Sequence, residues 1–183
     1  MKPPFLETER LVLRELTLRD AESYQQQIDD WAVARTLPKG FPWPYPADGG
    51  EKFIEKALMR NNPALIWAIA LKENREQMIG ILEMRPNQDD NHRGFWLGSA
   101  YHGNGFMSEA AEITQDYWFN HLDMVVLRVA NARGNDASHR LKNKIGRLVR
   151  VEDAEYNDPS LTQREVWEIT AADWQVYKAK LKP

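Results

Sequence analysis

The amino-acid sequence predicts a mixed α/β fold built as a single domain over residues 1–183. Two observations lead to this prediction. Short apolar segments of strand type follow one another in the middle of the chain, and segments with helical apolar spacing lie on both sides. Beyond residue 94, strand and helix segments alternate, which is typical of βαβ units. A chain of 183 residues with 43% hydrophobic residues is long enough to bury one sizeable core.

The first third of the chain predicts one strand, two helices and a proline-rich loop. Residues 10–14 alternate around a β-branched centre and predict a strand, and residues 20–31 carry apolar side chains at helical spacing. Four prolines within residues 37–46 exclude regular helix and sheet there. Asp48 is positioned to cap a second helix, which we expect residues 61–63 to end.

The middle of the chain predicts three strands and a long helix. Residues 66–71 and 78–84 are rich in Ile, Leu and Met, which indicates two strands, and the polar residues 73–77 indicate the turn between them. Residues 94–97 predict the next strand. After a loop that contains glycine, apolar spacing predicts a helix over residues 106–121.

The last third of the chain continues the alternation. Residues 124–130 form an apolar run typical of a buried strand, and residues 136–145 carry Ala, Leu and Ile at helical spacing. Residues 148–154 and 165–169 predict two more strands. Thr170 is positioned to cap a final short helix.

The composition excludes several classes of protein. With 24 basic and 27 acidic residues the chain has a net charge of −3, which argues against a general nucleic-acid-binding protein. Because cysteine is absent, a disulfide framework, a zinc–thiolate site and a cysteine nucleophile are excluded. The four histidines lack metal-ligand spacing, so we expect no metal. We find no signal-peptide pattern and no apolar run near 18 residues, so we expect a cytoplasmic protein without membrane contact.

The glycine-containing loop within residues 97–110 has the most chemical content. Gly103 and Gly105 flank Asn104 between a predicted strand and a predicted helix. Glycines allow successive backbone N–H groups to converge on an anion, and the start of a helix adds unpaired N–H groups and a positive dipole end. This pattern suits a phosphate or pyrophosphate, and its plain alternative is an ordinary strand-to-helix turn. A Walker loop is excluded because no Gly-Lys-Ser/Thr follows.

A basic segment at residues 128–150 also indicates an anionic ligand. It holds seven basic residues and one acid, Asp136, within a chain of net charge −3. We expect Arg140, Lys144 and Arg147 to lie within helical reach of one another. The alternatives are a solvated helix face or a nucleic-acid surface, although no aromatic residues are interleaved for base stacking.

Three motifs together resemble one known family. Residues 103–110, Gly-Asn-Gly-Phe-Met-Ser-Glu-Ala, resemble the acyl-CoA pyrophosphate loop of the GCN5-related N-acetyltransferases (GNAT), and more narrowly of the RimJ/RimL type. Residues 8–14, Thr-Glu-Arg-Leu-Val-Leu-Arg, are similar to the opening strand of that type. Residues 135–138, followed by Lys144 and Gly146, resemble its Asn-x-x-Ser block. The resemblance covers nearly the whole chain.

The resemblance implies a GNAT-like acyl-CoA N-acyltransferase fold of the α/β (α+β) class. Its central twisted sheet is mixed but mostly antiparallel, with about six to seven strands and helices on both faces. The implied reaction moves an acetyl group from acetyl-CoA to a primary amine by direct transfer in a ternary complex. The acceptor is a protein N-terminal amine or, alternatively, a small molecule such as a polyamine, amino acid or antibiotic. We expect a monomer or homodimer.

The resemblance also implies where acetyl-CoA binds: at the end of one strand, along the glycine loop and at two helix starts. The residues implied are Trp96, Leu97, Gly98, His102, Gly103, Asn104, Gly105, Phe106, Met107, Ser108, Asn135 and Ser138. In that family the pantetheine arm lies between two splayed strands, and a backbone N–H near residues 96–98 would polarise the thioester carbonyl.

The catalytic and acceptor-binding candidates are fewer. We expect Asn135 to fix the pantetheine or the amine, and Ser138 to protonate the departing sulfur, although a plain helix-start serine is the alternative. Glu83 is an acid within an apolar strand and is a candidate base, with an outward-facing strand residue as its alternative. Trp43 and Tyr45 in the proline-rich loop are candidates for the acceptor pocket. A water chain to a later glutamate, Glu152 or Glu155, is another route for the proton.

Several positions depart from the family pattern. Ala100 stands where Arg or Gln is frequent, and Asn104 replaces a usual Lys, which removes a positive charge near the phosphates. Arg93 stands where Glu is common, Arg147 where Phe is usual, and Lys142 where many relatives carry a catalytic Tyr. The missing Tyr and the Arg93 and Ala100 departures favour a further hypothesis, a catalytically weak acyl-CoA-binding protein, whereas the basic segment at residues 128–150 favours a third, a nucleic-acid-binding domain.

Overall fold

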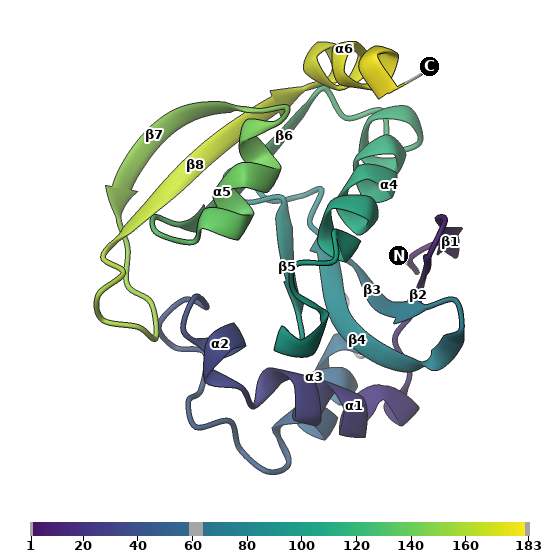
Figure 1. The fold of residues 1–183 in the computed structure, drawn as a ribbon, viewed down its shortest axis with the longest axis vertical. Helices are drawn as coiled ribbons and strands as arrows, with labels where there is room; N and C mark the ends of the chain where they lie inside the picture. The colour runs from purple at the N-terminus through teal and green to yellow at the C-terminus, as the bar shows by residue number, and fades with distance from the viewer. Residues whose placement is uncertain (1, 59–63, 182–183) are drawn as a thin grey trace.

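The computed structural model describes residues 2–58 and 64–181, which form two β-sheets and the helices that cover them (Figure 1). In chain order the elements are β1 (Leu6–Glu7), β2 (Leu11–Glu15), η1 (Leu18–Asp20), α1 (Ala21–Ile28), α2 (Trp31–Ala34), α3 (Gly49–Leu58), β3 (Leu65–Leu71), β4 (Asn74–Met84), β5 (Arg93–Leu97), η2 (Ser99–Tyr101), α4 (Phe106–Asn120), β6 (Val126–Ala132), α5 (Asp136–Asn143), β7 (Arg147–Asp153), β8 (Gln163–Thr170) and α6 (Ala171–Leu181). The expected helix end at residues 61–63 lies outside the described residues.

The larger sheet has the strand order β1-β2-β3-β4-β5, and the smaller has the order β6-β8-β7. All paired neighbours within each sheet are antiparallel. Figure 1 shows α1 and α3 on one side of the larger sheet and α4 on the other. Both faces of the larger sheet are therefore covered, which explains why its central strand is apolar throughout.

The central strand β3 shows how the two faces are filled. Trp67 and Ile69 pack into the core that includes α4, whereas Ile66 and Ala68 pack into the core that includes α1 and α3. Successive side chains of a strand point to opposite faces, so one unbroken apolar run supplies both cores.

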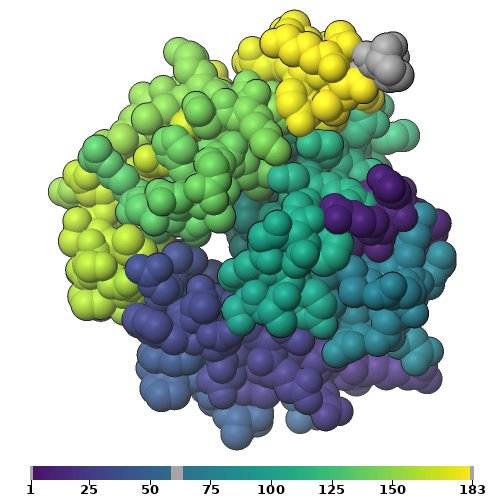
Figure 2. Space-filling view, in the orientation of Figure 1, coloured from purple at the N-terminus to yellow at the C-terminus, as the bar shows by residue number. Residues whose placement is uncertain are grey.

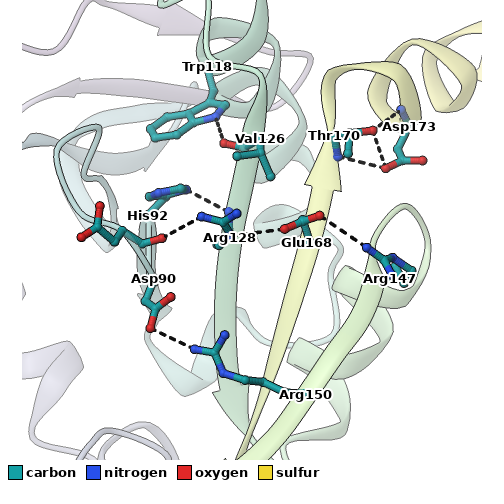
Figure 3. Close-up of polar contacts among 11 residues, drawn as sticks. Asp90, His92, Trp118, Val126, Arg128, Arg147, Arg150, Glu168, Thr170 and Asp173 are labelled. Atoms are coloured by element: carbon teal, nitrogen blue, oxygen red, sulfur yellow. Dashed lines mark hydrogen bonds and ion pairs between the residues drawn. The ribbon is translucent and has the colours of Figure 1, made fainter.

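The two sheets meet where β5 and β6 begin and separate along the rest of these strands (Figure 1). The His92 N–H donates to the Arg128 carbonyl at 2.8 Å, and the Arg128 N–H donates to His92 Nδ1 at 2.9 Å. The side chain of Arg128 also bonds Glu168, as Figure 3 shows. Beyond this seam no ladder pairs β5 with β6 among the described residues, so a gap opens between the sheets.

Most expected elements are present, with three corrections to their boundaries and one strand pair that the sequence does not predict. Strand β4 begins at Asn74, so the expected turn over residues 73–77 shrinks to two residues. The first helix ends at Ile28, and Trp31 begins a separate short helix. Helix α5 ends at Asn143, two residues before its expected end. The pairing of β1 with β2 was not expected, because a two-residue strand has no period to detect. Within the described residues, no helix has the length and apolarity needed to cross a membrane.

Candidate functional site

The glycine loop ends in a helix start that no side chain caps. Gly103 and Gly105 both have φ of +79°, a left-handed conformation that glycine adopts without strain. Gly105 is the N-cap of α4 and provides no side-chain hydrogen bond. A side chain added at Gly103 would meet no atom within 4 Å, so the space beside it is open. The first N–H groups of α4 lack partners within the helix and point to a site that suits an anion.

The connection between β1 and β2 holds this helix start in place. Glu109, in the first turn of α4, accepts hydrogen bonds from the Thr8 hydroxyl and from the Arg10 N–H and guanidinium. Burial alone would raise the pKa of Glu109, but these hydrogen bonds outweigh it and lower the pKa. The Arg10 guanidinium also donates to the Asn104 carbonyl at 3.0 Å and lies over the Phe106 ring. The chain segment of residues 8–10 therefore fixes the glycine loop.

The guanidinium of Arg10 lies where it can supply the positive charge that is absent at Asn104. It lies 3.5 Å from the position that a Gly105 side chain would occupy. A guanidinium, itself paired with Glu109, thus stands beside the loop although Asn104 replaces the usual lysine. The sequence offers a signal for it, because Arg10 belongs to the same motif that resembles the family's opening strand.

The remaining expected loop residues have identifiable places. His102 is exposed, and its Nε2 lies 2.9 Å from the Leu97 carbonyl, so it stabilises the loop from within. The Asn104 side-chain amide donates to the His102 carbonyl. Met107 and Ser108 lie in the first turn of α4 and are half-buried, and the exposed Ala100 lies in η2. The loop residues expected to contact acetyl-CoA are therefore gathered at one helix start.

The edge of β5 requires a correction within residues 96–98. The Gly98 N–H donates to the Ile79 carbonyl at 2.9 Å, so it is not free to bond a ligand. Backbone groups alternate in direction along a strand, so those of Phe95 and Leu97 face the gap between the sheets. The Trp96 side chain lies on the other face, 5.2 Å from the ring of Tyr24. The gap therefore offers Phe95, which the sequence did not indicate, in place of Gly98.

The start of α5 borders the same gap. The Asn135 side chain accepts a hydrogen bond from the Ser138 N–H and thereby caps the helix. One helical turn on, Lys142 donates from Nζ to the Ser138 hydroxyl oxygen at 2.5 Å. The hydroxyl of Ser138 then accepts this bond and keeps its own proton to donate elsewhere. Asn135 was expected to contact a ligand, and the structure shows that its side chain also caps α5.

Two buried cations lie next to each other beneath α4 and α5. Lys142 is 1% exposed and Arg93 is 3% exposed. Lys142 Nζ lies 5.3 Å and Arg93 Cζ lies 5.5 Å from the Phe95 ring centroid. Burial and the charge of Arg93 lower the pKa of Lys142 well below its usual value, although Glu165 acts in the opposite direction. Burial also lowers the pKa of Arg93 to about 10. The sequence predicts neither feature, because a lysine on a short polar helix is expected to face solvent.

Glu83 lies on the opposite face of the larger sheet. Its side chain lies on the face of the sheet that packs against α1 and α3. Its carboxylate pairs with the Arg85 guanidinium at 3.1 Å. A side chain at Gly94, its partner on β5, would collide with Arg85. Glu83 is thus a half-buried, ion-paired carboxylate on the face that carries Trp96, rather than an outward-facing strand residue.

The two aromatic candidates of the proline-rich loop point to different places. Tyr45 is buried, donates from its hydroxyl to the Gly49 carbonyl, and lines a cavity of about 270 Å³ beside α3. Trp43 is 39% exposed and lies 5.3 Å from the Trp31 ring at the start of α2. The structure therefore does not bring Trp43 and Tyr45 into one pocket. Instead, the ring of Trp43 packs beside that of Trp31.

Helix α2 closes one side of the gap. The Ser99 hydroxyl of η2 donates to the carboxylate of Asp30, the N-cap of α2, and this bond lowers the pKa of Asp30. Figure 2 shows an opening bordered by the green atoms of α5, the purple segment around α2 and the teal segment of η2 and the start of α4. α5, the segment around α2, and the segment of η2 and the start of α4 thus surround one opening.

The basic segment of residues 128–150 does not form the free cationic helix face expected from the sequence. Arg128 and Arg147 both pair with Glu168, and Arg150 pairs with Asp90 (Figure 3) and also with Glu152. Arg147 lies on β7 and not on α5, so it does not extend the helix face. These ion pairs reduce the charge surplus on which the nucleic-acid hypothesis rested.

A comparison with known protein families decides the assignment. Residues 10–147, most of the chain, match the profile of the family described as "Acetyltransferase (GNAT) domain". The chain belongs to the GNAT acetyltransferases. Its GNAT fold confirms the fold class expected from the sequence, with the sheet divided into parts of five and three strands. A 27% identical relative over 148 residues is the uncharacterized N-acetyltransferase YoaA of Bacillus subtilis (strain 168), covering 78% of this chain and 82% of that protein.

Solved structures of RimJ/RimL type share this GNAT fold. Mycobacterium smegmatis RimJ, in complex with CoA-disulfide, has a TM-score of 0.76 at 16% identity, covering 96% of this chain and 94% of that one. The ribosomal-protein-S5-alanine acetyltransferase from Vibrio fischeri has a TM-score of 0.76 at 18% identity, covering 93% of this chain and 98% of that one. The resemblance to the RimJ/RimL type is consistent with these neighbours.

Proposed function

We propose that this GNAT protein transfers an acetyl group from acetyl-CoA to a primary amine by direct transfer in a ternary complex. The observation that carries the proposal is the uncapped start of α4, where Gly103 and Gly105 open the backbone N–H groups to an anion. Such a helix start favours a pyrophosphate through both its N–H groups and its dipole. Arg10 adds a guanidinium beside the same loop.

The residues along the gap hold and orient the rest of the cofactor. The backbone groups of Phe95 and the Leu97 N–H face the gap and are free of β4, so they can pair with the amides of a pantetheine arm, whereas the Leu97 carbonyl already contacts His102. Bound acetyl-CoA supplies an acetyl group activated as a thioester. Holding an amine against it accounts for much of the rate expected without a covalent relay.

The proton needed by the departing sulfur comes from Ser138. Its hydroxyl oxygen accepts a hydrogen bond from Lys142, so its proton is free to be donated into the gap. On the other face of the sheet, Glu83 is the carboxylate positioned to accept the proton that the attacking amine loses. The proton donor Ser138 and the proton acceptor Glu83 thus lie on opposite faces of the sheet at β5.

We propose a protein N-terminal amine as the acceptor. Trp31 begins α2, the helix beside the opening, and the Trp31–Trp43 pair is about 40% exposed, which leaves an apolar and open wall suited to an extended peptide. The Vibrio fischeri neighbour is described as acting on a ribosomal protein, which supports the same class by analogy. A panel of N-terminal peptides and small amines, assayed by thiol release, distinguishes a peptide acceptor from a small-molecule acceptor.

Calorimetry with acetyl-CoA and a pair of matched variants tests the cofactor site. Gly105→Glu places a carboxylate at the glycine loop, whereas Gly40→Glu introduces the same residue at another positive-φ glycine, in the proline-rich loop. We expect micromolar binding to wild-type protein and to Gly40→Glu, and loss of binding in Gly105→Glu. Equal binding by both variants, or no binding to wild-type protein at millimolar acetyl-CoA, would overturn the proposal.

A further inference from the structure

We propose that the interior between the two sheets binds a carboxylate at the end of the acyl chain, so that the enzyme accepts a short dicarboxylic acyl-CoA such as succinyl-CoA. This inference rests on the acyl-CoA site proposed above and adds the class of acyl group. The carboxylate would pair with Arg93 and Lys142.

The first support is a pair of buried cations that no carboxylate neutralises by a hydrogen bond. Arg93 donates from Nη1 to the Gln115 side-chain oxygen at 2.6 Å, while its Nε and Nη2 have no partner among the described residues. Lys142 bonds the neutral hydroxyl of Ser138. A buried guanidinium with two unmet N–H groups is costly, and an anion with two oxygens supplies the missing acceptors.

The second support is the shortage of acceptors around these cations. The side-chain N–H₂ of Gln115 is also buried without a partner in the described chain. The carboxylate of Glu165, the acid that influences Lys142, is already bonded by Asn131 and by His139 Nδ1 at 2.8 Å. Unmet donors therefore face the interior from both α4 and β5, and the nearby carboxylate is engaged elsewhere.

The third support is the order of these groups along the gap. Ser138 lies in the first turn of α5, and Lys142 lies one turn further, about 6 Å along the helix axis. Arg93 begins β5, beside the seam where His92 joins the sheets. Beyond the hydroxyl that serves the sulfur, the cations thus follow one another toward the closed end of the gap.

The same placement assigns the carboxylate to the acyl group rather than to the acceptor. Arg93 contacts Gln115 of α4, and Lys142 belongs to α5, so both lie on the side of the sheet that carries the glycine loop. Trp96 and Glu83 lie on the opposite face, which we assigned to the amine. An acyl chain that enters with the cofactor reaches the cations, whereas an acceptor on the other face does not.

The transfer step stays balanced with this acyl group. The amine nitrogen forms a bond to the thioester carbon as the carbon–sulfur bond breaks. Glu83 takes the proton that the amine loses, and Ser138 gives a proton to the sulfur. The terminal carboxylate stays ionised throughout, bound to the two cations.

Calorimetry with three thioesters tests the inference without a known acceptor. Succinyl-CoA and butyryl-CoA have the same number of acyl carbons and differ in the terminal carboxylate, and acetyl-CoA reports the basal site. We expect succinyl-CoA to bind wild-type protein about tenfold more tightly than butyryl-CoA. This ratio should fall to about one in Lys142→Met and in Arg93→Met, and it should remain in Lys144→Met, which changes an exposed lysine just beyond α5.

Proton uptake gives a second, independent readout. The groups that face Lys142 are Arg93 on β5, Glu165 on β8 and, through Glu165, His139 on α5. Where the pH reaches the lowered pKa of Lys142, the amine of the free protein loses its proton, and a bound carboxylate favours its return. Succinyl-CoA binding should therefore take up protons at those pH values and weaken as pH rises further. Calorimetry in buffers of different ionisation enthalpy measures this uptake, and Lys142→Met should abolish it.

The outcomes separate this inference from the proposed function. If acetyl-CoA binds but succinyl-CoA binds no more tightly than butyryl-CoA, the dicarboxylic inference is wrong and the acetyl-CoA site stands. If the succinyl preference survives in both Lys142→Met and Arg93→Met, the carboxylate is bound elsewhere and the inference is again wrong. If none of the three thioesters binds, the acyl-CoA site itself is wrong.

Discussion

Ser138, the proton donor of the proposed mechanism, also has a structural place at the start of α5. Its backbone N–H is held by the Asn135 cap, and its hydroxyl oxygen accepts from Lys142. The two bonds fix the position of the hydroxyl and leave its proton unused. Ser138 is therefore more than a plain helix-start serine, which would use its own oxygen to cap the helix.

Replacing Ser138 with alanine should impair the transfer step more than cofactor binding. A positioned proton donor contributes about 10²–10⁴-fold, so we expect kcat to fall about 10²-fold while the affinity for acetyl-CoA changes less than about threefold. Thiol release with an active amine measures kcat. Ser160→Ala, in an exposed loop, is the control. A kcat for Ser138→Ala equal to that of the control would contradict the assignment.

The buried charge of Lys142 should reduce stability. Removing an uncompensated buried cation is stabilising. We therefore expect the free energy of unfolding of Lys142→Met at pH 7 to exceed that of the wild-type protein by about 1–3 kcal/mol. The folded-state pKa of Lys142 is lowered, so the unfolded state binds more protons below pH 10.5, and wild-type stability should rise with pH in that window relative to the variant. Denaturant unfolding over pH 6–9 tests both points. A less stable variant, or a constant difference across pH, would argue against a buried cation.

At the residue scale the sequence predicts the glycine loop but not the interior. Gly103 and Gly105 stand out because a left-handed backbone favours one residue type. Lys142 and Arg93 stand out only as departures from the family pattern, and their burial is not predicted, because it depends on contacts such as those of Arg93 with Gln115 of α4 and of Lys142 with Phe95 of β5. Such tertiary contacts leave no local pattern in the sequence.

At the element scale, the start of α4 depends on a chain segment about one hundred residues away. The Thr8 hydroxyl and Arg10 converge on Glu109, which turns two separate sequence motifs into one structural unit. In this chain the first motif holds the helix that the second begins. A change in this contact should therefore be felt at the cofactor loop.

Glu109→Gln should weaken both the helix start and cofactor binding. We expect a loss of about 1–2 kcal/mol in the free energy of unfolding at pH 7, since a charge-assisted bond to Arg10 is lost. The folded-state pKa of Glu109 is lowered, so the wild-type advantage is present above about pH 4.3 and is lost as pH falls through the folded pKa. We expect about tenfold weaker acetyl-CoA binding.

Denaturant unfolding and calorimetry measure these two effects. Glu112→Gln, which alters a carboxylate further along the same helix, is the control for cofactor binding. Unchanged acetyl-CoA binding in Glu109→Gln would show that the brace does not position the loop.

Element positions are largely predictable because periodicity is local. The strands around Trp67 and Val129 appear in the sequence as short apolar runs, and the structure confirms both. The predicted turn over residues 73–77 is wrong, because most of these residues belong to β4. They are polar and mostly exposed, as in a hairpin that extends into solvent. Polarity there reflects exposure rather than a turn.

At the scale of the whole molecule, the site depends on the separation of two sheets. No pattern in β5 or β6 predicts their separation, because it follows from which edges pair and where they stop. The seam is formed by His92 and Arg128, with Glu168 and Arg150 reinforcing it (Figure 3). The ligand gap exists because the pairing ends there.

The seam should be sensitive to acid. His92 Nδ1 accepts the Arg128 N–H, and burial lowers the pKa of His92 despite a backbone hydrogen bond that acts to raise it. The unfolded state therefore binds more protons near pH 6.5, and stability should fall as pH drops through this value toward the folded pKa. His92→Asn keeps an acceptor but cannot be protonated, so its stability should depend less on pH between 7 and 5. Parallel slopes for the two proteins would exclude the seam as the acid-sensitive element.

The central claim is that the glycine loop and the start of α4 bind the pyrophosphate of acetyl-CoA. Amide hydrogen exchange, measured with and without acetyl-CoA, tests it residue by residue. We predict that acetyl-CoA slows exchange at residues 103–108 more than elsewhere, with weaker protection at residues 95–97. Protection confined to other elements, with residues 103–108 unchanged, would contradict the claim.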